Sequence, residues 1–112
     1  MSFRLVVSDT ISVPVAGRIP DAAGRAMPFS FTLTARRLPA TELRLAIESN
    51  DRTVPEFLDS VVVGWSGVQD DNGVELPFSG SALHSLLDIV GMAGLVLKAY
   101  IEACGAKGKE KN

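Results

Sequence analysis

Residues 65–79, WSGVQDDNGVELPFS, hold the densest set of structural signals in this chain of 112 residues. Asn72 and Gly73 can both adopt positive φ, which favours a type I′ turn between two antiparallel strands. Ser79 is a natural N-cap for a helix that follows. The stretch therefore predicts a β-hairpin that carries Trp65, the only tryptophan, and leads directly into a helix.

The chain beyond residue 79 has the spacing of two successive helices. Gly91 is suited to end the first or to allow close packing before the second. The second helix carries two adjacent apolar stripes, and only Lys98 and Glu102 mark a clearly solvated edge. The stripes are Met92, Leu95, Val96, Ala99, Tyr100 and Ala103, and beside them Ala93, Leu97, Ile101 and Cys104. Two arrangements account for this breadth: a central helix covered on both sides, or a helix that offers one stripe to a partner helix or to another copy.

The first third of the chain has the period-two pattern of β-strands. Apolar residues recur at every second position at Phe3, Leu5 and Val7, at Ile11, Val13 and Val15, and at Phe29, Phe31, Leu33 and Ala35. Pro14 lacks an N–H donor, so its strand is expected at a sheet edge or at an irregularity. Glycines and prolines interrupt any period over residues 17–28, which we predict to form a loop.

Residues 39–63 change to helical spacing. A short amphipathic helix begins near Pro39 and can end at Asn50, with a stripe of Leu43, Ala46 and Ile47. Thr53 and Glu56 then form a capping box. The second helix carries the stripe Phe57, Leu58, Val61 and Val62. The β-branched run that ends at Val63 favours a switch to strand before the tryptophan.

These patterns predict an α+β fold in which a small antiparallel sheet packs against three to four helices in a single domain. The composition agrees, because 46% apolar and 21% charged residues are typical of a chain that buries a modest core. The side chains expected to join the sheet and helix layers are Trp65, Phe78, Leu83 and Leu87.

Charge and composition exclude several classes of partner. A net charge of −2 gives no broad attraction to nucleic acid or to an anionic membrane. No cationic leader with an apolar core is visible, and the apolar segment 86–97 is well below the roughly 20 residues of a membrane span. Cys104, the single cysteine, cannot form an intrachain disulfide or supply a zinc cluster, which fits a reducing cytoplasm.

The sequence offers no motif for catalysis. His84 is the only histidine, and its polar neighbours on the same helix are Ser81, Ser85 and Asp88. A Ser-His-Asp triad from one helix is geometrically implausible, so His84 is expected at the surface or at the core boundary. There is no phosphate-binding loop, no H-E-x-x-H helix and no C-x-x-C pair. We expect a non-enzymatic protein without cofactor or metal.

An acidic cluster leaves one further interpretation of the turn. Asp70, Asp71, Asn72 and Glu75 are residue types that calcium loops also use. An EF-hand, however, needs ligands at alternate positions over about twelve residues and a closing bidentate Glu, which this segment lacks. A calcium-binding or small-molecule-binding module is therefore the weakest alternative.

The order of short motifs resembles a family of bacteriophage and prophage tail assembly chaperones. Its centre is the series W-x-G-V, D-x-x-G and L-P-F-S, at residues 65–68, 70–73 and 76–79. The flanking matches are Arg36, Arg37 and Leu38 before a Glu-bearing helix, Phe57 and Leu58 before Val63 and Gly64, the segment LLDI at 86–89, and a terminal helix with Ala99 and Tyr100. Together they cover most of residues 3–104. Gly91 and Met92 depart from the family, in which a proline is expected at this point in many members.

The resemblance implies a chaperone-like domain over residues 1–104, and a charged C-terminal tail at 105–112 is expected to be flexible. It implies a protein of the bacterial host cytoplasm, made during infection or from a prophage, and not retained in the mature virion. Its partner would be the long helical tape measure protein, kept soluble while tail tube subunits polymerise around it. The candidate contact residues on the last helix are Met92, Leu97, Tyr100 and Ile101.

Two further hypotheses follow from the resemblance. Such chaperones often gain a second domain by a programmed frameshift, and that domain recruits the tail tube protein. Lys107, Gly108 and Lys109 can be encoded by AAG, GGA and AAG, which contains the slippery heptamer G GGA AAG, so the gene sequence decides this point. The main alternative function is a structural tail or head-tail component that forms a ring or tube through β edges.

Overall fold

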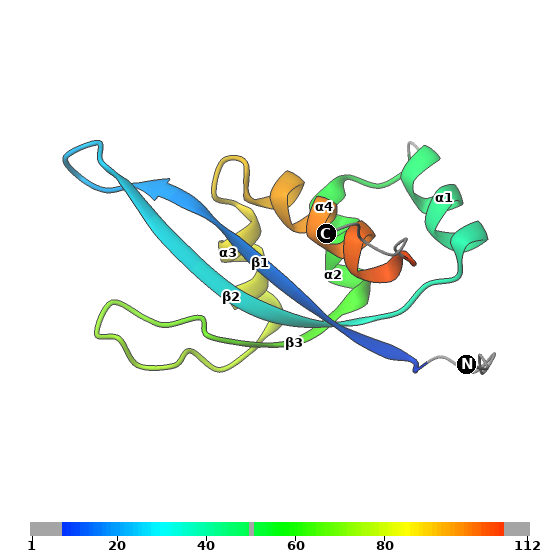
Figure 1. Ribbon diagram of the computed structural model, residues 1–112, viewed down its shortest axis with the longest axis horizontal. Coiled ribbons are helices and arrows are strands. Elements are labelled where there is room, and N and C mark those ends of the chain that lie inside the picture. The colour runs from blue at the N-terminus through cyan, green and yellow to red at the C-terminus, as the bar shows by residue number, and fades with distance from the viewer. Residues whose placement is uncertain (1–7, 50, 107–112) are drawn as a thin grey trace, which may run out of the picture.

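Three antiparallel strands and four helices make up residues 8–49 and 51–106, the part of the chain that this computed structural model describes (Figure 1). The sheet has the order β1–β2–β3, with strands β1 (Thr10–Pro20), β2 (Ala26–Arg36) and β3 (Val62–Ser66). The helices are α1 (Ala40–Glu48), α2 (Val54–Val61), α3 (Gly80–Leu87) and α4 (Met92–Cys104). The predicted α+β domain is confirmed. The strand expected at Phe3, Leu5 and Val7, the helix end at Asn50 and the tail from residue 107 lie outside the described residues.

One face of the sheet forms a wall of the core. Its buried side chains follow the period-two alternation and are Val13, Val15, Phe31, Leu33 and Ala35. α4 packs across β1, and α2 and α3 pack against α4, so the helices lie over this face (Figure 1). The opposite face carries exposed hydroxyl side chains at Ser12, Ser30, Thr34 and Ser66.

β1 and β2 form a long ribbon, and its turn corrects the sequence-based prediction. The loop predicted over residues 17–28 is wrong, because both strands continue to a short turn at residues 21–25. Gly24 has a φ of 82° and donates its N–H to the Asp21 carbonyl oxygen at 2.9 Å. The Asp21 carboxylate accepts two further backbone N–H groups of the turn, each at 2.9 Å. The aspartate and the glycine together make a reversal in which only the glycine needs a positive φ.

The register of the ribbon explains why it tolerates prolines. Hydrogen-bonded and non-hydrogen-bonded pairs alternate along an antiparallel ladder. Arg37 donates to the Asp9 carbonyl oxygen at 2.7 Å, and Asp21 donates to that of Arg25 at 2.8 Å. In the unbroken register between these bonds, the odd-numbered residues of β1 therefore bond to β2. Pro14 is even-numbered and directs its nitrogen away from β2, so no ladder bond is lost and its predicted place at a sheet edge is confirmed.

The loop over residues 67–79 repeats the same turn, and the returning strand of the predicted hairpin is wrong, because the chain here forms only one isolated bridge, between Gln69 and Glu75. The predicted type I′ turn is wrong, because only glycines among the described residues have positive φ, and Gly73 has 76°. Gly73 donates to the Asp70 carbonyl oxygen at 3.0 Å, and the Asp70 carboxylate accepts two later N–H groups at 2.8 and 3.1 Å. The spacing D-x-x-G thus builds both turns, since the Asp side chain satisfies inner N–H groups of the turn.

Local capping signals set the helix starts as predicted. Thr53 Oγ1 accepts the Glu56 N–H at 3.3 Å and Glu56 Oε1 accepts the Thr53 N–H at 2.9 Å, which confirms the capping box of α2. Ser79 Oγ accepts the Ala82 N–H at 3.1 Å at the start of α3. α2 passes directly into β3, as the run of valines indicated. Gly91, with a φ of 84°, ends the turn between α3 and α4.

The axes of α3 and α4 differ by 107°. Within the ranges 8–49 and 51–106, no single helix is long and apolar enough to cross a membrane. α3 and α4 reach the necessary length and composition only when they are counted together across this bend.

Two aromatic side chains attach neighbouring segments to the core through their polar atoms. The buried Tyr100 donates its hydroxyl hydrogen to the Arg36 carbonyl oxygen at 2.7 Å. The half-buried Trp65 donates its Nε1–H to the Leu76 carbonyl oxygen at 2.8 Å, and its ring meets Phe78 edge-on with 5.2 Å between centroids. Trp65 packs against the core, as predicted, and holds the loop that follows it.

Candidate partner-binding surface

α4 presents only two of the four predicted contact residues toward the surface. Met92 and Tyr100 are 5% and 1% exposed, because they share one helical face with Val96 and pack into the core. They are core residues, which corrects their assignment as partner contacts. Leu97 is half-buried and Ile101 is 37% exposed. One stripe of α4 therefore belongs to the core, and part of the other remains accessible.

Leu97 lies in a groove between α1, α2 and α4, which we call the α1–α4 groove. The groove has a volume of about 180 Å³. Its lining is mainly apolar and consists of Ala46, Ile47, Ser49, Arg52, Thr53, Val54, Phe57 and Leu97. Phe57 is buried, whereas Ile47 and Val54 are exposed on the two sides. Three helices that are distant in the sequence thus create one apolar depression at the surface.

α1 leaves much of its apolar surface uncovered. None of its residues is buried, and only Leu43 and Ala46 pack against the core. Leu45 is 60% exposed and Ile47 is 48% exposed. The predicted stripe of Leu43, Ala46 and Ile47 is therefore split, because Ile47 borders the groove. Ile47 and Val54 are exposed apolar side chains that border the same groove, which is typical of an interaction surface.

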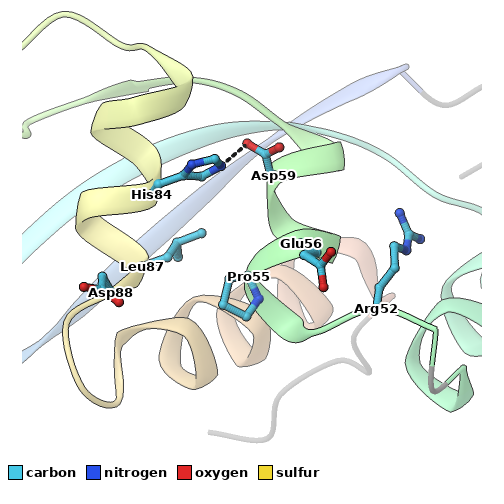
Figure 2. Close-up of a pocket in the computed structure, with 7 residues that line it drawn as sticks. All are labelled: Arg52, Pro55, Glu56, Asp59, His84, Leu87 and Asp88. Atoms are coloured by element: carbon cyan, nitrogen blue, oxygen red, sulfur yellow. Dashed lines mark ion pairs between the residues drawn. The ribbon is translucent and has the colours of Figure 1, made fainter.

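Arg52 is the only charged side chain among the described residues that line the α1–α4 groove. Its guanidinium carbon lies 5.7 Å from the centroid of the Phe57 ring, within the range of a cation–π contact. It forms no salt bridge with another described residue. Figure 2 shows Arg52 apart from the ion pair of His84 and Asp59 on the neighbouring helices. No sequence pattern pointed to this arginine, because its position depends on how α2 meets α1.

A second apolar depression lies at the opposite end of α4, between the ribbon and the turn that precedes α4. It has a volume of about 320 Å³ and is lined by Ile19, Phe29, Ile89, Val90 and Leu95, among others. Val90 is fully exposed there. Sequence reasoning missed this surface because it assigned residues 17–28 to a loop. The continued alternation through Ile19 and Phe29 was the available signal.

A polar hollow between α2 and α3 contains the only histidine (Figure 2). His84 Nε2 lies 3.1 Å from Asp59 Oδ1, and both side chains are exposed, so the pair contributes little to stability. The hollow has a volume of about 600 Å³, and its charged lining is Arg52, Glu56, Asp59, His84 and Asp88. Hydrogen bonds from Thr53, chiefly from its backbone, hold the pKa of Glu56 below its usual value. The histidine lies at the surface, as predicted, and pairs with a residue of α2 rather than with its own helix.

The acidic cluster after β3 uses carboxylates within the loop itself. The Asp70 carboxylate holds the turn, and Glu75 Oε1 accepts the Gly67 N–H at 2.8 Å. No group of three or more His, Cys, Asp or Glu side chains in the described part of the chain is arranged to hold a metal ion. Met92 lines the second apolar depression but is only 5% exposed. Leu97 is the predicted contact residue that lines the α1–α4 groove and is half-buried.

Comparisons with known protein families, with characterised proteins and with solved structures give no match to this chain. The case for a function therefore rests on the surfaces described above and on the motif order in the sequence.

Proposed function

We propose that this protein is a non-enzymatic tail assembly chaperone of a bacteriophage or prophage. In this role it binds the tape measure protein in the cytoplasm of the bacterial host and keeps it soluble while tail tube subunits polymerise around it. It does not remain in the mature virion. The motif order at residues 65–79 and around it supports the proposal, and the α1–α4 groove supplies a surface suited to such a partner.

The observation that carries the proposal is the exposed apolar surface around Leu97 and Ile101. A long tape measure protein exposes apolar helical stripes until the tube encloses it. Amphipathic helices bind by placing apolar side chains into a hydrophobic groove. The α1–α4 groove offers such a surface, and the exposed Ile47 and Val54 line it from α1 and α2.

The edges of the sheet weigh against the alternative of a ring or tube assembled through strands. Pro14 and Pro20 both direct their nitrogens to the free side of β1, where they remove donors that a further strand would need. On the other side, the pairing of β3 with β2 is short and is interrupted at Val63. A bulge of this kind also disfavours addition of a strand. Both edges are therefore poor templates for polymerisation.

Co-expression with the long helical protein encoded just downstream tests the proposal. We expect that protein to stay soluble and to copurify. Replacing Leu97→Asp together with Ile101→Asp is expected to reduce its recovery about tenfold or more, because truncating a central contact typically costs more than 1 kcal/mol. Circular dichroism must show that the variant retains its fold. Val74→Asp is the matched control, since Val74 is 60% exposed on a turn outside the groove.

One outcome would contradict the proposed function, and another would contradict the proposed contact surface. An insoluble partner alongside a closed ring of this protein alone would favour the structural tail component. Full copurification by a folded double variant would exclude the α1–α4 groove as the contact surface. If the double variant unfolds, Ile47→Asp repeats the test at an exposed residue outside α4.

A further inference from the structure

We infer that the α1–α4 groove selects a helix whose apolar stripe is flanked by carboxylates. One large apolar side chain of that helix enters the groove, and a carboxylate next to it pairs with Arg52. This inference rests on the proposed function, and it specifies the chemistry of the tape measure segment that binds.

The outer surface of α4 has the spacing that accepts a helix. Gly94, Leu97, Ile101 and Cys104 follow one another at intervals of three, four and three residues, which is the a and d pattern of a heptad. Gly94 is exposed, and a side chain added there would meet nothing within 4 Å. A partner backbone can therefore approach α4 closely at this point, while Leu97 and Ile101 contact its apolar stripe.

The size of the groove suits a single large side chain. Its volume of about 180 Å³ is comparable to a cavity of roughly 150 Å³ that takes up benzene. Ile47, Val54 and Phe57 line it from α1 and α2. Leucine, isoleucine, methionine or phenylalanine on the partner helix would bury its side chain there.

Charge gives the groove a preference for acidic flanks. Arg52 is the only charged side chain that lines it within the described ranges, and its fork can bind a carboxylate through two hydrogen bonds. Lys98 and Glu102 on the exposed side of α4 have opposite signs. Arg44 and Glu48 on α1 do so too. Glu56 lies near Arg52 in the hollow between α2 and α3, but it does not line the groove. Arg52 is therefore the charge that a helix seated in the groove itself would meet. The net charge of −2 disfavours an acidic helix. A measured preference for an acidic helix would therefore come from its contact with Arg52.

Two designed peptides test the inference without the natural partner. Both are helices of about three heptads with Leu at a and d, and they carry either Glu or Lys at e and g. Fluorescence anisotropy against the full chain is expected to show at least about tenfold tighter binding of the Glu peptide. The preference should weaken as salt rises, because the contact lies at the surface. Arg52→Glu is expected to reverse it, and Leu97→Asp to weaken both peptides.

Arg44→Glu is the matched control, because it makes the same charge change on α1 at a residue outside the groove lining. It should leave the preference for the Glu peptide within about twofold of wild type. Equal binding of the two peptides, binding of neither, or an unchanged preference in the Arg52→Glu variant would overturn the inference. Copurification of the tape measure protein is measured separately, so the proposed function could survive such a result.

Discussion

Tyr100 links α4 to β2 through a single buried hydroxyl group, and its ionisation should report on that link. Burial, and then the neighbouring Cys104 side chain, raise the pKa of Tyr100 above its ordinary value of 10.0. The unfolded chain therefore loses this proton at a lower pH than the folded chain. The resulting stabilisation is complete below pH 10 and is lost as the pH rises beyond it.

The variant Tyr100→Phe removes both the hydrogen bond and the ionisation of the hydroxyl group, and the two effects appear at different pH values. Loss of the hydrogen bond to the Arg36 carbonyl oxygen should lower the free energy of unfolding at pH 7 by about 1 kcal/mol. Tyr100 is the only tyrosine, so the variant should also lose less stability than wild type as the pH rises above 10. Urea denaturation at several pH values measures both changes. A steeper decline in the variant would contradict the assignment.

Gly17 allows the ribbon to pass close to α4. A Cβ at this position would lie 2.9 Å from Leu95 Cδ2 and 3.0 Å from Phe29 Cζ. Gly17→Val should therefore lower the free energy of unfolding by about 1–3 kcal/mol through overpacking. Gly94→Val on the open side of α4 is the control for packing, because no atom lies within 4 Å of its added Cβ. Thermal unfolding of both variants distinguishes a local clash from a general effect of valine, and equal losses would argue against the clash.

Among the elements, the two D-x-x-G turns should respond alike to substitution. Gly24 and Gly73 have φ values of 82° and 76°, a conformation that costs other residues about 1–2 kcal/mol. Gly24→Ala and Gly73→Ala should each destabilise the fold by about this amount. Gly80→Ala at the first turn of α3 should be neutral or slightly stabilising. Chemical denaturation of the three variants checks this, and an unaffected Gly73 variant would mean that the second turn does not require its glycine.

For the whole molecule, we expect the prolines of β1 to prevent association through the sheet. Pro14→Val with Pro20→Val would restore two edge donors and lengthen the strand available for pairing. The double variant should therefore show concentration-dependent dimers or larger species in size-exclusion chromatography with light scattering. Pro55→Ala in the first turn of α2 is the control, because it changes a proline outside the sheet. A double variant that associates no more than wild type would show that another feature protects this edge.

The sequence determined the features that depend on neighbours along the chain. Alternation identified the faces of β1 and β2, and Thr53, Glu56 and Ser79 marked the starts of α2 and α3. Such signals succeed because a strand or a cap is formed by residues a few positions apart. The short turn at residues 21–25 was not predicted. Gly17 and the prolines indicated a longer loop, although the D-x-x-G spacing of the turn was present in the sequence.

The packing of distant elements determines which apolar residues are available to a partner. Met92 and Leu97 are both apolar residues of α4, yet the first is buried and the second borders a groove. The difference arises because β1 and α2 cover one side of α4, and residues far apart in the sequence bring those elements together. Arg52 likewise lies over the Phe57 ring at a position that depends on how α2 meets α1. Periodicity defines the faces of a helix, whereas packing against distant elements determines which face remains exposed.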